Sequence, residues 1–231
     1  MTPSFIYFDL DNTLLDHSSA EEKAQFETYH SFPELQQVAI EEWLETYRLV
    51  NHSLWERYQN GEVDRLELQH SRFYDSMNRL KLECTISGKI GSFYMQNYRK
   101  HWSWIDGARS AFSDLAERFE VGIITNGFKE TQQLKFEHLE LKNYCDVMII
   151  SEEIGQLKPH PDVFDAATER AGVSRDEILY VGDSYTSDIV GGRNAGWQTA
   201  WFTGLNNIEI KKDQTADFQF NRFDELVELL S

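Results

Sequence analysis

The stretch FIYFDLDNTLLDH, residues 5 to 17, sets four apolar residues directly before two carboxylates, Asp9 and Asp11. A short apolar run bounded by polar residues is typical of a strand that is buried on both faces of a parallel sheet. In open parallel sheets, ligands bind beyond the carboxyl ends of the strands. We therefore expect residues 5–8 to form a buried strand and the two carboxylates to lie where a ligand binds.

Four further runs of this kind lie later in the chain, at residues 121–125, 147–150, 178–181 and 199–202. Strands that alternate with helices indicate a parallel sheet with helices on both faces. The expected fold class is α/β, with a doubly wound, Rossmann-like parallel-sheet core. Between these runs, apolar residues recur at intervals that place them on one face of a helix. They are Ala111, Phe112, Leu115, Ala116 and Phe119 in one segment and Val163, Phe164, Ala167 and Ala171 in another.

Residues 17–105 interrupt this alternation, because they contain no strand-like run. We expect an inserted helical unit there, and a core formed by residues 1–16 and 106–231. Most aromatic side chains of the insertion are expected to pack inside its own bundle. Its apolar residues recur at helical intervals, as in Ile40, Trp43, Leu44, Tyr47, Val50 and Leu54.

The charge balance limits the partners of the chain. Lys and Arg number 22 and Asp and Glu number 39, which gives a formal net charge of −17. A protein of that charge repels polyanions, so a nucleic-acid polymer and an acidic membrane are not expected as partners. A small anionic ligand stays compatible, because one cation or one Lys can reverse the potential inside a pocket. The sequence indicates no protein partner.

The two cysteines, Cys84 and Cys145, are too few and too far apart for a disulfide framework or a thiolate metal cluster. We expect both to be reduced and packed. The N-terminal residues carry no basic segment, and Asp9 interrupts the first apolar run far short of the roughly 20 residues that span a membrane. These features predict a cytoplasmic protein.

Polar residues follow four of the expected strands. Asp9 follows the first, the tripeptide TNG at 125–127 ends the second, Lys158 comes shortly after the third, and Asp183 follows the fourth. The carboxyl ends of parallel strands meet at one edge of a sheet. The sequence therefore predicts that these residues converge on one site.

The two carboxylates of the first motif suit phosphate chemistry. Asp9 can attack a phosphorus atom as a nucleophile and form an aspartyl phosphate, which water then hydrolyses. Asp11 has the same strand parity and can protonate the leaving oxygen and later deprotonate the water. This acid role is expected to need a pKa raised by a charged neighbour.

Carboxylates alone repel a phosphate, so the site needs a cation. Mg²⁺ fits, because it prefers oxygen ligands and binds through a few carboxylates together with substrate phosphate. The candidate ligands are Asp9, Asp183 and the backbone carbonyl of Asp11. The phosphoryl oxygens also need hydrogen-bond donors. The candidates for that role are Thr125, Lys158 and the backbone of Asn126 and Gly127.

Each motif has a simpler interpretation when it is taken alone. An EF-hand is excluded for the first motif, because Leu14 stands where that loop needs Gly and Ala20 where it needs Glu. A carboxylate of the first motif could cap a helix, and TNG could form a plain turn. Lys158 could be solvated, and Asp183 could cap the next helix. The joint occurrence of all four motifs in this order favours a catalytic site.

The four motifs, DLDNT (9–13), TNG (125–127), KP (158–159) and GDSYTSD (182–188), together resemble those of the haloacid-dehalogenase-like hydrolase superfamily. The helical insertion looks like the mobile cap of that family. The dehalogenase branch lacks an acid at the place of Asp11 and works without metal, so the resemblance implies phosphate chemistry. The implied roles are nucleophile for Asp9, acid and base for Asp11, phosphate binding for Thr125 and Lys158, Mg²⁺ binding for Asp183, and support for Thr13 and Asp188.

A finer resemblance appears in residues 50–73, 123–128 and 151–159, which look like those of bacterial pyrimidine 5'-nucleotidases. It implies a Mg²⁺-dependent phosphomonoesterase that removes the 5'-phosphate from pyrimidine nucleoside monophosphates, with a cap that closes over the ribose and base. Arg72 is expected to bind phosphate or another part of the substrate. The other candidates on the cap are Asn51, Trp55, Tyr58 and Phe73.

Three rival functions remain open at this point. The same site could serve a sugar-phosphate phosphatase, of the acylneuraminate 9-phosphate or phosphoglycolate type. A phosphomutase would reuse Asp9 and Asp11 but hold the phosphoenzyme until an intermediate returns. A binding module on the same fold would have no catalytic activity, since fold alone does not establish function.

Overall fold

The computed structural model describes residues 3–205 and 214–231. The chain divides into two compact units, one formed by Met1–His17 and Ser103–Ser231 and the other by Ser18–Trp102. The first unit holds the sheet and the second is helical. Each unit is described by itself below.

A six-stranded parallel sheet forms the first unit, with the strand order β3-β2-β1-β4-β5-β6. The expected α/β fold with a doubly wound parallel sheet is confirmed. All five expected strands are present, and β6 was missed because its three residues are too few to give a strand signal. The strands are β1 (Phe5–Phe8), β2 (Glu120–Thr125), β3 (Met148–Ile150), β4 (Ile178–Gly182), β5 (Gln198–Phe202) and β6 (Phe218–Phe220).

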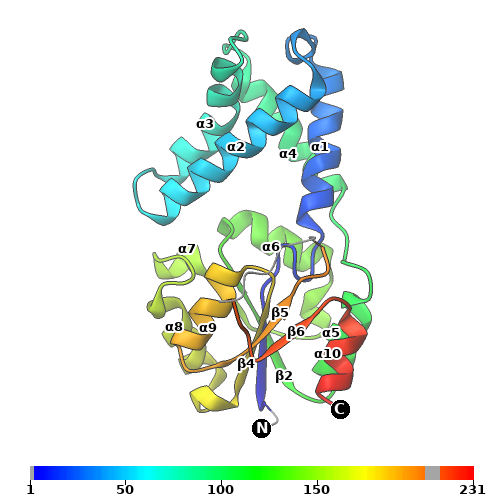
Figure 1. The fold of residues 1–231 in the computed structure, drawn as a ribbon, viewed down its shortest axis with the longest axis vertical. Coiled ribbons are helices and arrows are strands. Elements are labelled where there is room, and N and C mark those ends of the chain that lie inside the picture. Colours follow the sequence, from blue (N-terminus) through cyan, green and yellow to red (C-terminus); the bar gives the residue numbers. More distant parts are fainter. Residues whose placement is uncertain (1–2, 206–213) are drawn as a thin grey trace. The chain divides into compact units, whose positions relative to one another are not determined.

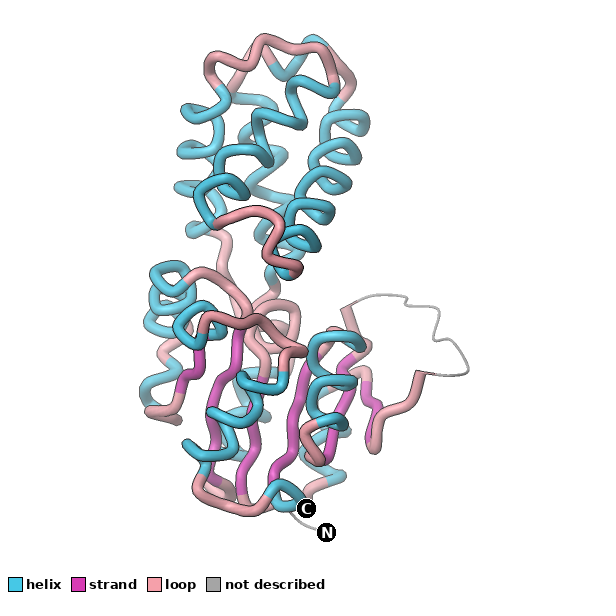
Figure 2. The backbone as a smooth tube through the Cα atoms, turned by 90° about the vertical axis from the view of Figure 1, so that its left-hand side faces the viewer, coloured by secondary structure: helices cyan, strands magenta, loops and turns pink. Residues whose placement is uncertain are grey.

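Helices cover both faces of this sheet. In Figure 1, α5 and α10 lie on one side of the strands and α8 and α9 on the other, and Figure 2 shows the strands side by side between the helices. The helices are α5 (Ala108–Ala116), α6 (Lys129–His138), α7 (Ser151–Ile154), α8 (Pro161–Ala171), α9 (Val190–Asn194) and α10 (Phe223–Leu229).

The strand order places β1 between β2 and β4. The chain runs outward from β1 through β2 to β3, and then crosses back to β4 on the other side of β1. The loops that follow β1, β2 and β4 therefore open at the point where the strand order reverses, which is where ligands bind in such sheets. This topology brings the first, second and fourth motifs to one place.

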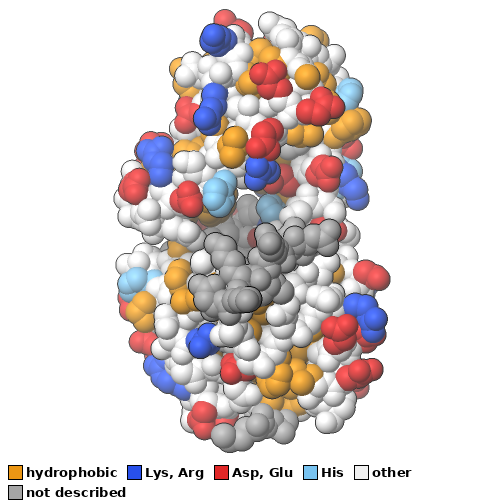
Figure 3. All heavy atoms as spheres, viewed as in Figure 1, with side chains coloured by type: hydrophobic (Ala, Val, Ile, Leu, Met, Phe, Trp, Pro, Cys, Tyr) orange, Lys and Arg blue, Asp and Glu red, His pale blue; other side chains and the backbone are white. Residues whose placement is uncertain are grey.

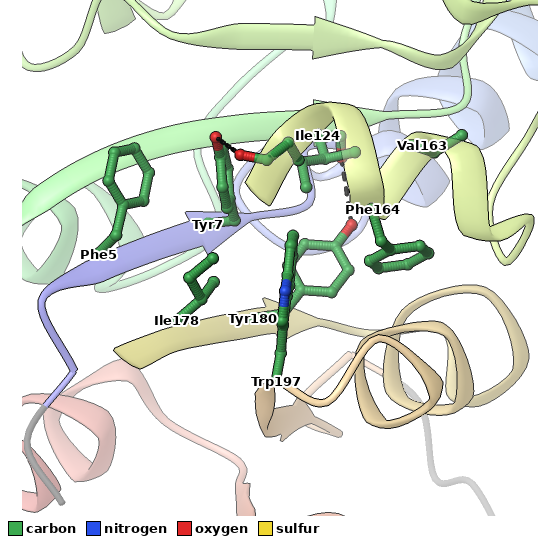
Figure 4. Packing of buried hydrophobic residues seen from close by; sticks show 9 residues of the cluster. Phe5, Tyr7, Ile124, Val163, Phe164, Ile178, Tyr180 and Trp197 are labelled. Carbon is green, nitrogen blue, oxygen red and sulfur yellow. Dashed lines mark hydrogen bonds between the residues drawn. The ribbon is translucent and has the colours of Figure 1, made fainter. Parts of the chain in front are cut away.

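An aromatic cluster packs against the face of the sheet that α8 covers (Figure 4). The Tyr7 ring stacks on Trp197, with 5.5 Å between ring centroids, and its hydroxyl donates to the carbonyl of Ala167 at 2.8 Å. Tyr180 belongs to the same cluster, and its hydroxyl reaches the carbonyl of Ile124 at 3.3 Å. Because this hydroxyl lies at the end of the cluster nearest the polar motifs, it connects the core with the site.

The second unit is a bundle of four helices, α1 (His17–Ser31), α2 (Ile40–Gln59), α3 (Arg65–Arg79) and α4 (Ser87–Lys100). Its core is aromatic: Trp43, Tyr47, Phe73 and Tyr94 are buried and lie within ring-contact distance of one another. The helical character expected for this segment is observed. Its role as a cap stays a prediction.

On the face shown in Figure 3, acidic side chains are interspersed with basic ones over the described residues.

The cysteines agree in part with expectation. Both cysteines are free, but only Cys145 is buried, and the expectation that Cys84 is packed away is wrong because its side chain is partly exposed. None of the described helices is long and apolar enough to cross a membrane. The cytoplasmic location stays a prediction.

Candidate active site

A tight loop after β1 aims the first carboxylate at the end of the sheet. The backbone N–H of Asp9 donates to the carbonyl of Val181 at 2.8 Å, which extends the pairing of β1 with β4 by one residue. The amides of Leu14 and Leu15 then return to the carbonyl of Leu10. Asn12 takes a left-handed conformation, with φ of 64°, which an Asn tolerates better than most residues. The chain thus turns sharply while the Asp9 side chain stays in the site.

Lys158 is the centre of the site. Its ammonium lies 2.6 Å from Asp9 Oδ1, 2.8 Å from Asp188 Oδ1 and 2.6 Å from the Tyr180 hydroxyl. The side chain is 2 % exposed, so a solvated loop lysine is excluded. The side chains of the first, third and fourth motifs therefore lie together, as the sequence predicts.

The charges of this cluster shift its protonation equilibria. Burial favours the neutral amine of Lys158, but the carboxylates of Asp188 and Asp9 outweigh it and raise the pKa of the lysine. Burial raises the pKa of Asp9 to about 7, the Lys158 ammonium opposes that rise, and the carboxylate of Asp188 adds to it. One ammonium thus does not balance the negative charge gathered around it.

Asp183 increases this excess of negative charge. Burial and the carboxylates of Asp9 and Asp188 raise its pKa well above the usual value. The Thr13 hydroxyl lies 3.2 Å from Asp9 Oδ2 and 3.3 Å from Asp183 Oδ1, and its single proton can satisfy only one of them. Oxygens of all three aspartates lie within 4.8 Å of one another. Such a set of hard oxygen atoms with unbalanced charge fits a divalent cation such as Mg²⁺.

Asp188 is a less suitable metal ligand than its two neighbours, because protein donors occupy both of its oxygens. Oδ1 accepts from Lys158 and from Tyr180, and Oδ2 accepts from the backbone N–H of Ser184 at 3.0 Å. A Cβ at Gly182 would lie 2.4 Å from Asp188 Oδ2, so only glycine fits beside this carboxylate. The position supports the expectation that Asp188 holds other site residues in place.

The TNG motif ends β2 beside the lysine. Thr125 is buried, and its hydroxyl oxygen accepts from the N–H of Gly127 at 3.4 Å. The Asn126 side chain makes two hydrogen bonds to the backbone of Lys158, donating to its carbonyl at 2.9 Å and accepting from its N–H at 2.7 Å. Asn126 therefore positions Lys158, a role that sequence reasoning did not include.

Asp11 differs from expectation. Its carboxylate lies 2.6 Å and 2.9 Å from the Lys135 ammonium and accepts from the Gln132 amide at 3.0 Å. Burial favours a higher pKa for Asp11, but the charges of Lys135 and His17 and the hydrogen bonds from Lys135 and Gln132 lower it overall. The expectation of a raised pKa is wrong for this conformation, because a lysine from α6 pairs with the carboxylate.

The candidate residues in the helical unit have mixed surroundings. Phe73 is 1 % exposed and packs in the bundle core, so its side chain does not lie on the surface of the helical unit. The guanidinium of Arg72 lies 5.5 Å from the ring centroids of Phe73 and Tyr94, and one of its N–H groups points at the sulfur of Met95. Its buried Nε has no hydrogen-bond partner among the described residues. Arg72 is thus unusually placed for a core residue.

The other candidates of the helical unit, Asn51, Trp55 and Tyr58, also contact residues of that unit. Asn51 donates to Glu21 at 3.4 Å, and the same Glu21 oxygen accepts from the Tyr94 hydroxyl at 3.2 Å. Trp55 and Tyr58 contact each other edge to face, with ring centroids 5.8 Å apart. All of these contacts lie inside the helical unit.

Sequence reasoning missed Tyr180, Gln132 and Lys135. The last two are the buried residues of α6, on which Leu134 is 38 % exposed, so the inward face of this helix does not follow from its apolar residues. Two polar residues three positions apart on the inward face of a helix that follows a motif are unusual, because inward faces are normally apolar. Tyr180 lies in an apolar strand and likewise gave no signal.

The chain matches the model of one protein family, haloacid dehalogenase-like hydrolase, over residues 6–202. The chain belongs to this family. It is therefore a hydrolase, and the resemblance inferred from the four motifs is confirmed.

Individual relatives are consistent with that assignment. The chain is 37 % identical over 205 residues to pyrimidine 5'-nucleotidase YjjG of Escherichia coli, covering 85 % of this chain and 84 % of the relative. It is 29 % identical over 238 residues to glyceraldehyde 3-phosphate phosphatase of Pyrococcus furiosus, covering 97 % and 92 %. The crystal structure of the HAD-hydrolase YfnB from Bacillus subtilis superposes with a TM-score of 0.86 and 26 % identity, covering 100 % and 99 %. YfnB is bound to magnesium there and shows interdomain movement.

The raised pKa values of Asp9 and Asp183 predict how Mg²⁺ affects stability. In the absence of a cation, both groups hold their protons to a higher pH than in the unfolded chain, which releases them near pH 4. The contribution of Asp9 to stability therefore falls as the pH rises from about 4 to about 7, and that of Asp183 also falls as the pH rises. Mg²⁺ bound to these carboxylates would replace the protons, so we expect tighter binding above pH 7 than below it. A concentration about 100-fold above the dissociation constant stabilises by about 2.7 kcal/mol, a rise in Tm of roughly 5–10 °C.

The measurement is the Mg²⁺-induced change in Tm at about pH 5.5 and about pH 8. We expect a clear rise at the higher pH and little at the lower one. Asp183→Asn should abolish the rise, while Asp176→Asn, an exposed aspartate of the same unit, should keep it. An equal rise at both pH values would contradict the assignment of the cation to these carboxylates.

Proposed function

We propose that the chain is a Mg²⁺-dependent phosphomonoesterase that works through an aspartyl phosphate and acts on pyrimidine nucleoside 5'-monophosphates. The observation that carries the chemistry is the buried Asp9 carboxylate, with one oxygen on the Lys158 ammonium and the other beside Thr13 and Asp183. A carboxylate held in this way is oriented for attack, and the neighbouring ammonium lowers its pKa against the larger effect of burial.

In the first step, an oxygen of Asp9 attacks the phosphorus atom while the bond from phosphorus to the 5'-oxygen breaks. Asp11 protonates the departing 5'-oxygen, and the nucleoside leaves. Water then attacks the phosphorus of the aspartyl phosphate and gives a proton to Asp11, which restores both carboxyl groups. The proton that Asp11 gives in the first step is thus returned in the second.

The other motif residues stabilise charge on the phosphoryl group. Thr125 ends β2, and its hydroxyl would donate to a phosphoryl oxygen together with the N–H groups of Asn126 and Gly127. Lys158 lies in the loop between α7 and α8, where Asp9, Ile124, Tyr180 and Asp188 already surround its ammonium, so it would stabilise the phosphoryl group mainly through its positive charge. Asp9, Asp183 and the backbone carbonyl of Asp11 would hold Mg²⁺, with Asp188 and Thr13 in support. The ion would neutralise charge on the phosphate.

The substrate class rests on the relatives. YjjG is named a pyrimidine 5'-nucleotidase, and its 37 % identity with this chain extends over most of both proteins. We extend the proposal to Arg72, a part-buried residue whose buried Nε has no hydrogen-bond partner among the described residues and whose guanidinium has the sulfur of Met95 as a weak acceptor. A ligand with oxygen acceptors would satisfy it better than thioether sulfur does. The cap role of residues 17–105 is part of this proposal.

A sugar phosphate is the second candidate substrate. The observation in its favour is the 29 % identity with a glyceraldehyde 3-phosphate phosphatase over nearly the whole chain. The catalytic residues would be the same, and the two proposals differ only in the alcohol that leaves. A phosphomutase would differ by retaining the phosphoenzyme, and a binding module would release no phosphate.

The proposal predicts phosphate release from uridine and thymidine monophosphates in the presence of Mg²⁺. Asp9→Asn should lower the rate at least about 10³-fold, because the amide cannot form the phosphoenzyme. The measurement is phosphate release from a panel of nucleoside monophosphates and sugar phosphates, with Asp176→Asn as a control that keeps full activity. Release from sugar phosphates alone would overturn the substrate, and full activity of Asp9→Asn would overturn the mechanism.

The role proposed for Arg72 gives a separate prediction. Arg72→Met should raise KM for nucleoside monophosphates about 10-fold or more and leave the hydrolysis of p-nitrophenyl phosphate within about 3-fold, because that ester lacks ribose and base. Arg79→Met on the same helix α3 is the control, since Arg79 is exposed. Equal losses with both substrates would mean that Arg72 only stabilises the bundle.

A further inference from the structure

The side chain of Lys135 on α6 is only 3 % exposed, although lysine side chains are usually solvated. Its ammonium lies 2.6 Å from Asp11 Oδ1 and 2.9 Å from Asp11 Oδ2. Gln132, one turn earlier on α6, donates to Asp11 Oδ2 at 3.0 Å and is 2 % exposed. Burying a lysine and a glutamine is costly unless they are paired. The Lys135 ammonium and the Gln132 amide nitrogen pair with the same carboxylate, while Gln132 Oε1 has no hydrogen-bond partner among the described residues.

These three contacts hold the Asp11 carboxyl group in one plane. A carboxylate has about four acceptor positions, and three are occupied by Lys135 and Gln132, so about one is left for a reacting proton. A group that must face first a leaving oxygen and then a water gains from such fixing, because a displacement of about 1 Å can cost about 100-fold in rate.

The second motif makes room for this arrangement. A Cβ at Gly127 would lie 1.5 Å from Gln132 Nε2 and 2.4 Å from its Cδ, so the amide occupies the space that a side chain at position 127 would fill. The glycine of TNG therefore permits the Gln132 amide to reach Asp11. The need for glycine at position 127 thus follows from the Gln132 amide alone and does not depend on phosphate binding.

We propose that Lys135 and Gln132 are positioning residues for the acid and base chemistry of Asp11. Both contact the Asp11 carboxyl group and are not proposed to contact the substrate. They act by fixing the orientation of the carboxyl group that exchanges a proton with the leaving oxygen and with water. The inference rests on the phosphomonoesterase function proposed above and adds to it the device that orients its proton-transferring group.

The test uses two esters that differ in their need for an acid. The 5'-oxygen of a nucleoside must be protonated as it leaves, whereas p-nitrophenolate leaves as a stable anion. In the wild-type protein both esters need Asp11 for the second step, in which water attacks the aspartyl phosphate and loses a proton. Loss of orientation should therefore slow the first step for the nucleotide and only the second step for p-nitrophenyl phosphate.

In Lys135→Met we expect kcat for uridine monophosphate to fall about 10- to 100-fold, with KM changed less than about 3-fold. The first turnover of p-nitrophenyl phosphate should stay within about 3-fold of wild type and be followed by a slower steady state, which appears as a burst of p-nitrophenol. Lys135→Arg should retain most of the activity, because it keeps a cation within reach of the carboxylate. Gln132→Met should show the same pattern with a smaller loss.

The control is Lys129→Met, which removes a lysine of the same helix whose ion pair with Glu153 is also 2.6 Å long but half-exposed. It should leave both activities unchanged. Equal losses in the first turnover of the two esters in Lys135→Met, or no loss in either step, would overturn the positioning role. Absence of phosphate release from the wild-type protein with either ester would instead overturn the proposed function.

Discussion

The ammonium of Lys158 is the interaction on which the site depends. It is buried among oxygens supplied by β1, by β4 and by the segment after β4, through Asp9, Tyr180 and Asp188. A buried ammonium without partners would cost several kcal/mol, and so would the two carboxylates without it. The strand ends can therefore hold this arrangement only while all the charges are present together. The excess negative charge that remains makes the site suited to a cation, which would in turn attract a phosphate.

The rest of the site consists of groups that hold this cluster in place. Asn126 makes two hydrogen bonds to the backbone of Lys158, and Gly182 leaves space for Asp188. Lys135 and Gln132 give Asp11 a separate set of partners. The two carboxylates of the first motif, two residues apart in the chain, thus have opposite electrostatic surroundings: the pKa of Asp9 is raised and that of Asp11 is lowered. This order is the reverse of the one that the proposed roles need, because a nucleophile reacts in its charged form and a general acid in its protonated form. The proposed roles therefore require a bound cation to lower the pKa of Asp9 and the substrate phosphate to raise that of Asp11.

Much of this could be predicted from sequence, because strand ends in a parallel sheet meet at one edge and polar residues there stand out against apolar runs. Asp9, Lys158 and Asp183 were found in this way. The pairing of Asp11 with Lys135 and Gln132 could not be predicted, because it depends on which face of α6 is turned toward Asp11. Tyr180 was hidden in an apolar strand, and β6 is only three residues long. Contacts that arise from packing between distant segments give no local signal, and the proposed substrate rests on relatives more than on motifs.

The most direct measurement of the central claim is a chemical trap of the phosphoenzyme. The protein would be mixed with uridine monophosphate and Mg²⁺, quenched, and treated with borohydride, which reduces an acyl phosphate to an alcohol. Mass spectrometry of the peptides then locates the reduced residue. The account predicts homoserine at position 9, in a yield that depends on substrate. Reduction at another carboxylate, or phosphate release with no reduced residue at all, would contradict the assignment of Asp9 as the nucleophile.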